Sequence, residues 1–402
     1  MPEQTLLLSA RQASLALPRT PVLGWSSFGR AGGNAIRSVQ QLPHLAFTTS
    51  GRAALYQALR QLALPAGSVV LVPTYHCPTM VAPILRAGMQ PKFFGISADG
   101  LPELSSICSA ATEHARAMIV PHYFGLPRSL ATVRAWCDQH RVALIEDCAH
   151  SFFGDAGERP VGAWGDYSTA SISKFLPVSE AGLLGSATRP LKSLELSSRS
   201  LTAQIKGLVD VLEPSVRYGR LHGLNAGLDQ LFRWKNRRKF KAGAPAPTTE
   251  ADTSHSAASV ASMMHSCDMD RIDKAPLWIC TQLARRLPHG RVVSRRRANF
   301  TLYSKHFDGV RGARPLFPAP PPAVAPYVFP LWVDDADRVY DALRAIDAPV
   351  FRWDRIWPGT PMLSDDQGPL WSRHVLQLLC HQDLSADDVT HVARVTTELL
   401  HP

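Results

Sequence analysis

The first half of the chain alternates short apolar runs with helical patterns, and this alternation most constrains how it can fold. Four runs predict strands that are buried on both faces: residues 69–73, 92–96, 117–121 and 142–146. Helix-like segments lie between them, such as residues 53–64, which carry apolar side chains on one stripe. This repetition predicts an α/β fold with a mainly parallel sheet that is covered by helices on both faces.

The organisation changes after residue 190, and a chain of 402 residues is too long for one simple core. We therefore predict two domains of unequal size. The large domain, residues 1–262, has an N-terminal arm and a flexible excursion at residues 233–262. The excursion is basic over residues 233–241 and then rich in Ala, Ser, Thr and Pro. Residues 290–402 are expected to form a smaller α/β domain.

Within the smaller domain, the pattern predicts helices, a proline-rich connector and a strand. A basic helix is expected at residues 295–303, the connector at 316–326, a strand at 327–333 and a helix at 336–346. The last helix is predicted to begin at Ser385, which opens a capping-box-like segment.

Composition argues against several classes of protein. The formal net charge of +10 favours anionic ligands without naming one. The 7 cysteines include no CxxC pair and no metal-type spacing, so we predict no disulfide scaffold, no zinc finger and no metal. No apolar run is long enough for a transmembrane helix, and the N-terminus does not read as a signal peptide. We therefore expect a cytoplasmic protein.

Polar segments follow the predicted strands, at the ends where ligands bind in parallel sheets. They are residues 49–53, 73–78, 146–150 and 165–174. In the first segment a glycine opens a helix, so free N–H groups and the helix dipole can bind an anion. No segment is specific by itself, because such a turn is most often only a helix cap and a lone lysine is most often solvated. Their order and spacing together carry the inference.

An anion cradle, then a buried carboxylate, then a lysine 27 residues later is the layout that holds pyridoxal 5′-phosphate (PLP). This cofactor needs a lysine amine for its covalent attachment, a carboxylate beside its ring nitrogen, and donors for its phosphate. Lys174, Asp147, the turn at Ser50–Ala53 and Thr169 can supply these groups.

The same segments resemble the DegT/StrS family of PLP-dependent sugar aminotransferases, which has the fold-type-I architecture. The matching strings are TSGRAAL (49–55), VPTYHCPTM (72–80), VPHYFG (120–125), EDCAHSF (146–152), GDYSTASISK (165–174) and EAGLLG (180–185). The resemblance covers residues 45–190 well. It is weaker over residues 290–402, where RRRANF and LLCHQDLSADDV are similar to family segments.

The resemblance implies a role for each matching residue. Lys174 takes the position that binds the cofactor covalently and moves protons, and Asp147 takes the position beside the pyridinium nitrogen. His150 falls beside the cofactor hydroxyl, and Thr169 replaces the usual serine at a phosphate contact.

The resemblance also assigns the phosphate turn. Ser50, Gly51 and Arg52 fall where relatives bind the phosphate, mainly through main-chain N–H groups. Arg52 adds a cation that the family's usual threonine lacks, and this cation either strengthens phosphate binding or reaches a substrate phosphate.

The chain departs from the family pattern where relatives place an aromatic ring over the cofactor. That position is Cys77 here, and Tyr75 or His76 takes over the stacking role if the loop is shifted. After the lysine segment, the usual Gly-Gly is Ala181-Gly182.

The reaction that the resemblance implies is transamination from an amino acid, commonly glutamate, to a keto-sugar that is carried on a nucleotide. Lys174 favours transfer, because relatives that dehydrate their substrate have histidine at this position. Three alternatives stay open: a non-sugar ketone or aldehyde as acceptor, another PLP reaction such as decarboxylation or acyl transfer, and a non-catalytic PLP-binding regulator.

The resemblance further implies a homodimer, because fold-type-I sites lie at a two-fold interface. Residues 1–40 suit an arm that packs on a neighbour. The basic run at residues 233–241 is either a solvated face or a donor to the partner's site, and contact with an anionic membrane stays open. A nucleic-acid partner is not expected, because no nucleic-acid module surrounds the run.

Overall fold

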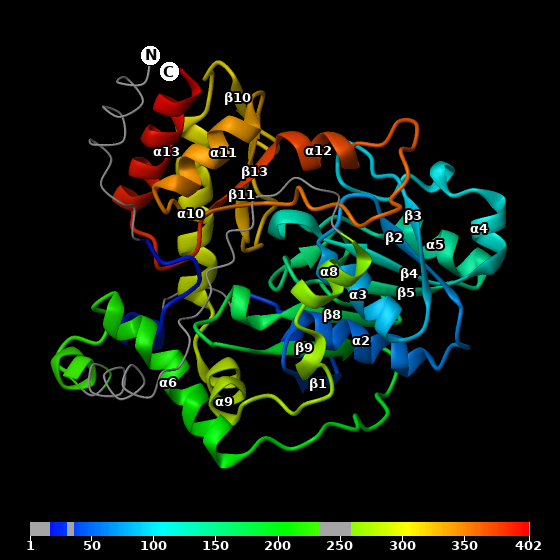
Figure 1. Cartoon of the computed structure of the whole chain (residues 1–402), viewed down its shortest axis with the longest axis horizontal. Helices are drawn as coiled ribbons and strands as arrows, with labels where there is room; N and C mark the ends of the chain where they lie inside the picture. The colour runs from blue at the N-terminus through cyan, green and yellow to red at the C-terminus, as the bar shows by residue number, and fades with distance from the viewer. Residues whose placement is uncertain (1–16, 30–35, 231, 233–258, 402) are drawn as a thin grey trace.

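The protein is built around two β-sheets that lie side by side (Figure 1). The computed structural model describes residues 17–29, 36–230, 232 and 259–401. A seven-stranded sheet comes from the first half of the chain, and a four-stranded sheet comes from the C-terminal part, residues 290–401. The basic run at residues 233–241 and residues 1–16 of the expected arm lie outside the described residues.

The large sheet is mainly parallel, as predicted. Its order is β1 (His44–Thr48), β9 (Gly182–Ser186), β8 (Tyr167–Ser171), β5 (Ala143–Asp147), β4 (Ala115–Pro121), β2 (Val69–Pro73) and β3 (Gln90–Phe94). Strand β9 runs antiparallel to both of its neighbours, and the other adjacent pairs are parallel. The carboxyl ends of the parallel strands therefore meet at one edge, which is where a ligand site is expected.

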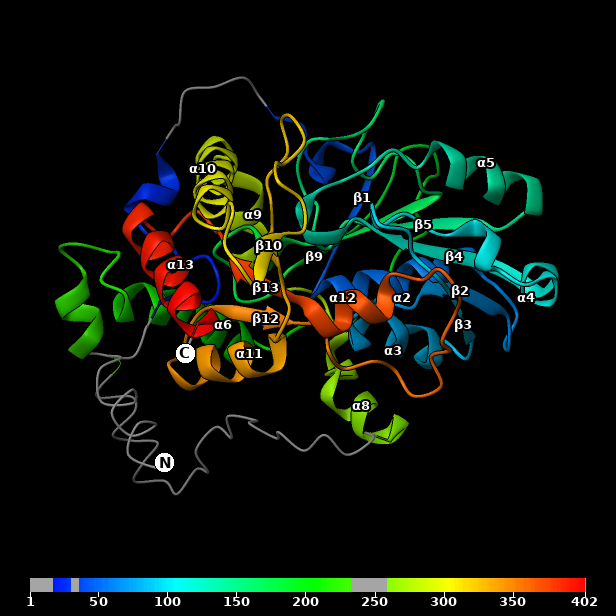
Figure 2. The same ribbon diagram turned by 90° about the horizontal axis from the view of Figure 1, so that it is seen from above.

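Helices cover both faces of the large sheet because its central strands are apolar on both sides. Helices α2 (Gly51–Leu62) and α3 (Pro78–Arg86) pack on one face with Val70 and Ile119. Helix α5 (Ala131–His140) lies on the other, and its Val133 packs in one cluster with Leu144. Figure 2 shows α5 above the sheet and both α2 and α3 below it. Alternate side chains of one strand thus enter two different cores.

The four strands predicted from the apolar runs all form, and the range predicted for β2 is the observed one. The expectation of burial on both faces is wrong for β3, where Gln90 and Lys92 are exposed. Strand β3 is the edge of the sheet, so one side of its backbone and part of its surface face solvent.

The small sheet is antiparallel throughout, in the order β10 (Ala313–Pro315), β11 (Val328–Val333), β13 (Val375–Leu379) and β12 (Val350–Arg352). Three long helices accompany it: α10 (Gly290–His306), α11 (Ala336–Ala345) and α13 (Ala386–Leu400). The capping box expected at the start of the last helix is present, because the Ser385 hydroxyl and the Asp388 carboxylate each accept the other residue's backbone N–H.

The remaining elements connect these layers. The helices are α4 (Ser109–His114), α6 (Leu201–Arg217), α8 (Val260–Ser266), α9 (Trp278–Arg286) and α12 (Gly368–His374). A small hairpin is formed by β6 (Asp155–Ala156) and β7 (Arg159–Pro160). The 3-10 turns are η1 (Trp25–Phe28), η2 (Val39–Gln41), η3 (Leu104–Ser106), η4 (Tyr123–Gly125), η5 (Ile172–Lys174) and η6 (Met269–Arg271). Within the described part of the chain, none of the helices has the length and apolar character needed to span a membrane.

Candidate active site

A cavity of about 270 Å3 lies at the carboxyl edge of the large sheet. Its walls come from segments that directly follow β1, β2, β4, β5 and β8, as the strand-end reasoning predicts. Seven of the nine site residues singled out from the sequence line it: Ser50, Gly51, Arg52, Cys77, Asp147, His150 and Lys174. Thr169 and His76 are not among the lining residues.

The N-terminus of α2 forms one end of the cavity. The Ser50 hydroxyl caps the helix by accepting a hydrogen bond from the Ala53 N–H at 3.2 Å. The N–H groups of Gly51 and Arg52 have no partner within the helix, so this wall favours an anion. Gly182 allows the turn to lie close to β9, because a Cβ at this position would collide with the main-chain carbonyl of Ser50. The usual Gly-Gly of the family is Ala181-Gly182 in this chain, and the packing requires glycine only at the second position.

The Arg52 side chain is held by a neighbouring segment. Its guanidinium donates hydrogen bonds to the main-chain carbonyls of Cys267 and Asp268, which follow α8. These acceptors are neutral, so they do not cancel the charge of Arg52 at the cavity wall. Nearby, the Thr49 hydroxyl donates to the carbonyl of Arg271 at 2.7 Å, and Arg271 also lines the cavity.

Asp147 lies at the end of β5, and its Oδ1 accepts hydrogen bonds from the Ala149 N–H at 2.9 Å and from the Thr169 hydroxyl at 3.2 Å. Burial raises the pKa of the Asp147 carboxyl above its usual value, and these bonds together with Lys174 offset only part of the rise. Thr169 thus lies against the carboxylate rather than in the cavity wall. The residue of β8 whose hydroxyl lines the cavity is Ser171. Ser171 lies against the start of α2, because a Cβ added at Gly51 would come within 3.2 Å of the Ser171 Cβ.

His150 is buried between two aromatic rings from the C-terminal part. Its ring centroid lies 4.4 Å from that of Tyr327 and 4.8 Å from that of Trp353. Burial lowers the pKa of His150 well below its usual value, so the ring is neutral. Its Nδ1 is buried and has no hydrogen-bond partner among the described residues. A buried polar atom without a partner indicates that a bound molecule completes its hydrogen bonding.

Lys174 ends the turn η5, directly after β8, and its side chain reaches the cavity. Its Nζ lies 5.1 Å from the centroid of the Tyr327 ring. Burial lowers the pKa of the Lys174 ammonium below its usual value, and Cys77 and Asp147 offset only part of this shift. The amine therefore becomes neutral, and nucleophilic, at a lower pH than a solvated lysine does.

The segment after β2 separates into residues that face the cavity and residues that do not. Cys77 lines the cavity, and its sulfur lies 3.0 Å from the Thr79 hydroxyl. His76 is only 2 % exposed, and its two ring nitrogens are engaged by the Pro73 carbonyl at 2.9 Å and the Trp357 N–H at 3.2 Å. His76 therefore holds the loop, which leaves it no free edge toward the cavity. Tyr75 packs in an aromatic cluster, with Trp353 at 5.2 Å between ring centroids.

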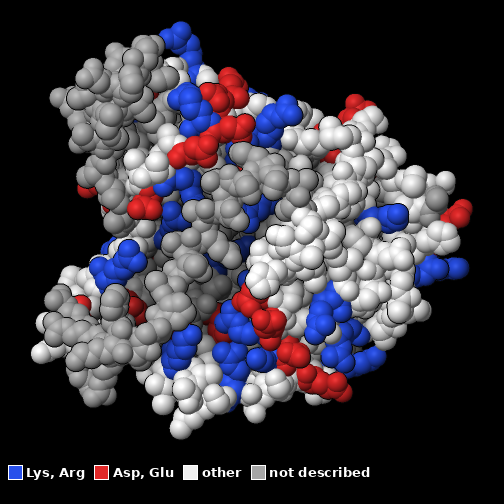
Figure 3. All heavy atoms as spheres, in the orientation of Figure 1, with Lys and Arg blue, Asp and Glu red and all other residues white. Residues whose placement is uncertain are grey.

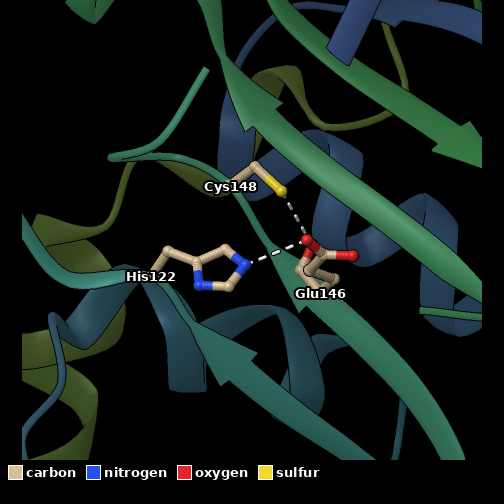
Figure 4. Close-up of side chains that lie close together, drawn as sticks. All are labelled: His122, Glu146 and Cys148. Carbon is tan, nitrogen blue, oxygen red and sulfur yellow. Dashed lines mark hydrogen bonds and ion pairs between the residues drawn. The ribbon is translucent and has the colours of Figure 1, made fainter. Parts of the chain in front are cut away.

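His122 lines the cavity and forms a buried pair with Glu146, a pairing that the sequence did not predict. Figure 4 shows His122, from the end of β4, pointing toward Glu146. Glu146 accepts hydrogen bonds from His122 Nε2 at 2.9 Å and from the backbone N–H groups of Gly162, Trp164 and Gly165. Burial alone raises the pKa of Glu146, but these bonds outweigh it and hold the pKa below its usual value.

His122, Glu146 and Cys148 lie close enough together to suggest a metal site. The hydrogen bonds to Glu146 occupy both of its carboxylate oxygens, so it has no free oxygen to offer an ion. The three residues are better explained as an anchor that fixes the end of β5, and therefore Asp147, to β4 and to residues 162–165.

Sequence reasoning also missed Trp353, Arg271 and Ser171. Trp353 and Arg271 lie more than 90 residues from Lys174 in the sequence, and no local motif marks either of them. Ser171 lies inside the string GDYSTASISK, where the alternation of β8 points Thr169 and Ser171 to the same face. That alternation was the available signal for Ser171.

Comparison with known proteins supports the resemblance to sugar aminotransferases that the sequence motifs carry. Residues 34–192 match the model of the DegT/DnrJ/EryC1/StrS aminotransferase family. The chain is 27% identical over 168 residues to GDP-perosamine synthase of Vibrio cholerae, a match that covers 40% of this chain and 46% of that protein. It is 26% identical over 204 residues to a UDP-N-acetyl-3-dehydro-alpha-D-glucosamine 3-aminotransferase of Acidithiobacillus ferrooxidans, covering 50% of this chain and 53% of that protein. The chain thus spans about half the length of the curated relatives it matches.

The likeness of fold extends over nearly the whole chain. The crystal structure of DesV from S. venezuelae superposes with a TM-score of 0.60 at 16% identity, covering 99% of this chain and 93% of that one. This confirms the fold-type-I α/β architecture that the sequence resemblance implies. By sequence, residues 34–192 are similar to the DegT/DnrJ/EryC1/StrS aminotransferase family, and the likeness over the whole chain is one of fold.

Proposed function

We propose that this protein is a PLP-dependent aminotransferase that moves an amino group from an amino acid, glutamate, to a keto-sugar carried on a nucleotide. One observation carries the proposal: a single cavity brings together an amine with a lowered pKa, a half-buried carboxylate and an open helix N-terminus. The acceptor is proposed from the relative whose name specifies a UDP-linked dehydro-sugar.

The residues of the cavity fit PLP. The phosphate would lie against the N–H groups of Gly51 and Arg52 and the hydroxyls of Ser50 and Ser171. The unpartnered Nδ1 of His150 is suited to the hydroxyl of the cofactor, because a neutral imidazole nitrogen can donate or accept. In place of the phosphate contact that the resemblance implies for Thr169, we propose that this residue orients Asp147, to which it donates a hydrogen bond.

When bound, PLP supplies an aldehyde that condenses with amines and a ring that withdraws electrons from the reacting carbon. Lys174 Nζ would provide the amine that holds the cofactor. When it is free, Nζ would also accept a proton from the substrate and return it, for which a neutral amine is required. The burial that lowers its pKa favours this neutral form.

Asp147 would hold a proton on the ring nitrogen of the cofactor. Burial alone disfavours the charged carboxylate, but a cation placed against it reverses this preference. The Ala149 N–H and the Thr169 hydroxyl fix its Oδ1 and so orient the carboxylate. The hydrogen bond between His122 and Glu146 links the end of β4 to the end of β5, next to Asp147.

We further propose that the enzyme is a cytoplasmic homodimer with domain limits near residues 262 and 290. Large apolar side chains on its surface support an interface: Trp25, Phe28, Leu201, Ile205 and Trp278 are all exposed. On the face shown in Figure 3, basic and acidic side chains are interleaved and do not form one field of a single sign. This pattern favours a small anionic substrate over nucleic acid as the partner.

The test uses the full chain with PLP and follows the absorption band of the bound cofactor at about 410–430 nm. An amino donor should remove the band, and a nucleotide keto-sugar should restore it. A panel of nucleotide keto-sugars, with free keto-cyclitols and simple aldehydes beside them, identifies the acceptor. Loss of carbon dioxide from the donor, or a band that no amino donor changes, would contradict transamination.

A further inference from the structure

A guanidinium from the C-terminal part reaches the main chain of the reactive lysine. Arg296 lies on α10 and is 0% exposed. Its Nη2 donates to the carbonyl of Lys174 at 2.6 Å, and its Nη1 donates to the carbonyls of Pro326 and Tyr327 at 3.0 and 3.2 Å. One side chain therefore links the end of η5 to the segment that leads into β11.

Gln382 completes a closed set of hydrogen bonds with Arg296. Its Oε1 accepts from Arg296 Nε at 2.9 Å, and its Nε2 donates to the carbonyl of Phe175 at 2.8 Å. The guanidinium also lies over the Phe175 ring, 4.6 Å from the centroid. The two side chains thus bind the consecutive carbonyls of Lys174 and Phe175, and we call them the Arg296–Gln382 clamp.

The clamp is costly as a purely structural device. Arg296 has only neutral hydrogen-bond acceptors, because all four of its bonds go to carbonyl or amide oxygens. Burial lowers the pKa of this guanidinium to about 10. An apolar side chain of similar volume would avoid burying a charge in this way. A buried cation that is bonded to the reactive lysine points to a role at the site rather than in general stability.

The position of the clamp relative to Lys174 supports such a role. A second cavity, of about 200 Å3, is lined by both Arg296 and Lys174. It shares Ser173, Lys174 and Ser179 with the cavity of the candidate active site. Lys174 therefore lies between two cavities, and the direction of its side chain depends on how its main chain is held.

Local bonds alone do not hold this main chain. The N–H groups of Phe175 and Leu176 both donate to the carbonyl of Ile172 at 2.9 Å, which closes the turn. Among the described residues, the carbonyls of Lys174 and Phe175 accept side-chain hydrogen bonds from Arg296 and Gln382 only. Removal of the clamp therefore frees the end of η5 while its start remains tied.

We propose that Arg296 and Gln382 are positioning residues that aim Lys174 at the cofactor from the C-terminal part of the chain. This inference deepens the proposed function and rests on it for the identity of the cofactor. Because the clamp touches main-chain carbonyls, it acts on the geometry of the amine rather than on its chemistry. A shift of about 1 Å in a reacting group costs about 10²-fold in rate.

The experiment compares Arg296→Met, Arg296→Lys and Gln382→Met with the control Arg297→Met, all in the full chain. Arg297 is the next residue on α10, and it donates to the carbonyls of Pro321 and Val324 instead. Two quantities are measured: hydrogen exchange over residues 172–178 in the cofactor-free protein, and kcat with the KM of the amino donor in the loaded enzyme.

We expect Arg296→Met and Gln382→Met to speed exchange over residues 172–178 by about tenfold, because the turn opens locally more often. We expect kcat to fall by about 10²-fold while the KM of the donor changes little. Arg296→Lys should change both the exchange rate and kcat less than Arg296→Met does, because an ammonium can still donate to the Lys174 carbonyl. Arg297→Met should leave both unchanged.

Unchanged exchange and kcat in both clamp variants would overturn the proposal. So would equal effects of Arg296→Met and Arg297→Met, since these would trace the change to the helix as a whole. If Arg296→Met does not fold, Gln382→Met decides, because it leaves the guanidinium bonded to three carbonyls. If the protein binds no PLP, the proposed function fails, but the exchange measurement still tests the clamp.

Discussion

The strand-end segments of residues 44–186 and the C-terminal part, residues 290–401, meet at Lys174 but contribute different kinds of side chain. The strand ends supply short polar and charged groups, such as Ser50, Asp147 and Lys174 itself. The C-terminal part supplies aromatic rings at Tyr327 and Trp353. It also supplies the Arg296–Gln382 clamp.

This difference separates the groups that we propose to react from the groups that we propose to hold them. The proposed reacting groups follow strands at fixed spacings, because the carboxyl ends of parallel strands meet at one edge. The holding groups come from helices and loops whose place is set by packing. Variants of the first region should therefore remove activity outright, and variants of the second should reduce it by degrees.

The largest effect is expected for Lys174→Ala. Loss of the amine removes both the covalent attachment of PLP and the proton transfer, so kcat should fall by at least about 10⁴-fold. Borohydride reduction followed by peptide mapping should tag Lys174 in the parent chain and no residue in the variant. Lys206→Ala, an exposed position on α6, is the control and should behave like the parent. A tag on any other lysine of the parent chain would contradict the assignment.

Asp147→Asn should lower kcat by about 10³-fold, because a neutral amide no longer holds the proton on the ring nitrogen. Circular dichroism and thermal melting should show a folded protein, since the amide keeps an oxygen to accept from Ala149 and Thr169. Asp155→Asn, at an exposed residue of β6, is the matched control. Turnover near the parent value in Asp147→Asn would remove this residue from the mechanism.

The first of the two regions was largely readable from the sequence. Apolar runs predicted β2, β4 and β5 within two residues, because strands that are buried on both faces need continuous apolar side chains. Seven of the nine proposed site residues line one cavity, because each follows a strand of the same parallel sheet. The assignment of a role to each of these residues stays a prediction that the variants above test.

The remaining contacts of the site and the strand order could not be predicted from the sequence, because they depend on long-range packing. The sequence allowed His76 to stack on the cofactor if the loop after β2 is shifted, yet the main-chain N–H of Trp357, far along the chain, binds its ring. The contacts of Arg296 with Lys174 and Gln382 span 122 and 86 residues, and no periodicity predicts them. The edge position of β3 likewise follows from strand order, which the apolar run at residues 92–96 does not contain.

A titration should compare one buried histidine from each region. Burial lowers the pKa of both His76 and His381 to about 4, below the value of 6.5 that an unfolded chain has. Between these values the unfolded state binds more protons, so stability falls as the pH drops from about 6.5 to about 4. Each histidine should account for about 3 kcal/mol of this loss at pH 4.

Urea unfolding at pH 7, 5.5 and 4 measures this effect. His76→Gln and His381→Gln should each make the free energy of unfolding less dependent on pH, since an amide can engage neighbouring backbone groups without titrating. The two variants should act additively, because the two histidines belong to different regions. If His76→Gln left the slope unchanged, the ring would have to be protonated without unfolding, and the loop after β2 would be looser than its contacts indicate.

The smallest effect concerns two serines with the same local role, one in each region. Ser50 caps α2 and Ser385 caps α13, with hydroxyls that accept from backbone N–H groups at 3.2 and 3.1 Å. Alanine at either position should lower the free energy of unfolding by about 1 kcal/mol.

Only Ser50 also lines the cavity. Ser50→Ala should therefore weaken PLP binding by about tenfold as well, through a lost bond to a charged phosphate. Denaturant unfolding of the cofactor-free protein measures the first effect, and titration with PLP measures the second. Equal PLP affinities in Ser50→Ala and Ser385→Ala would mean that the Ser50 hydroxyl makes no bond to the phosphate, and its proposed role in binding the cofactor would be wrong.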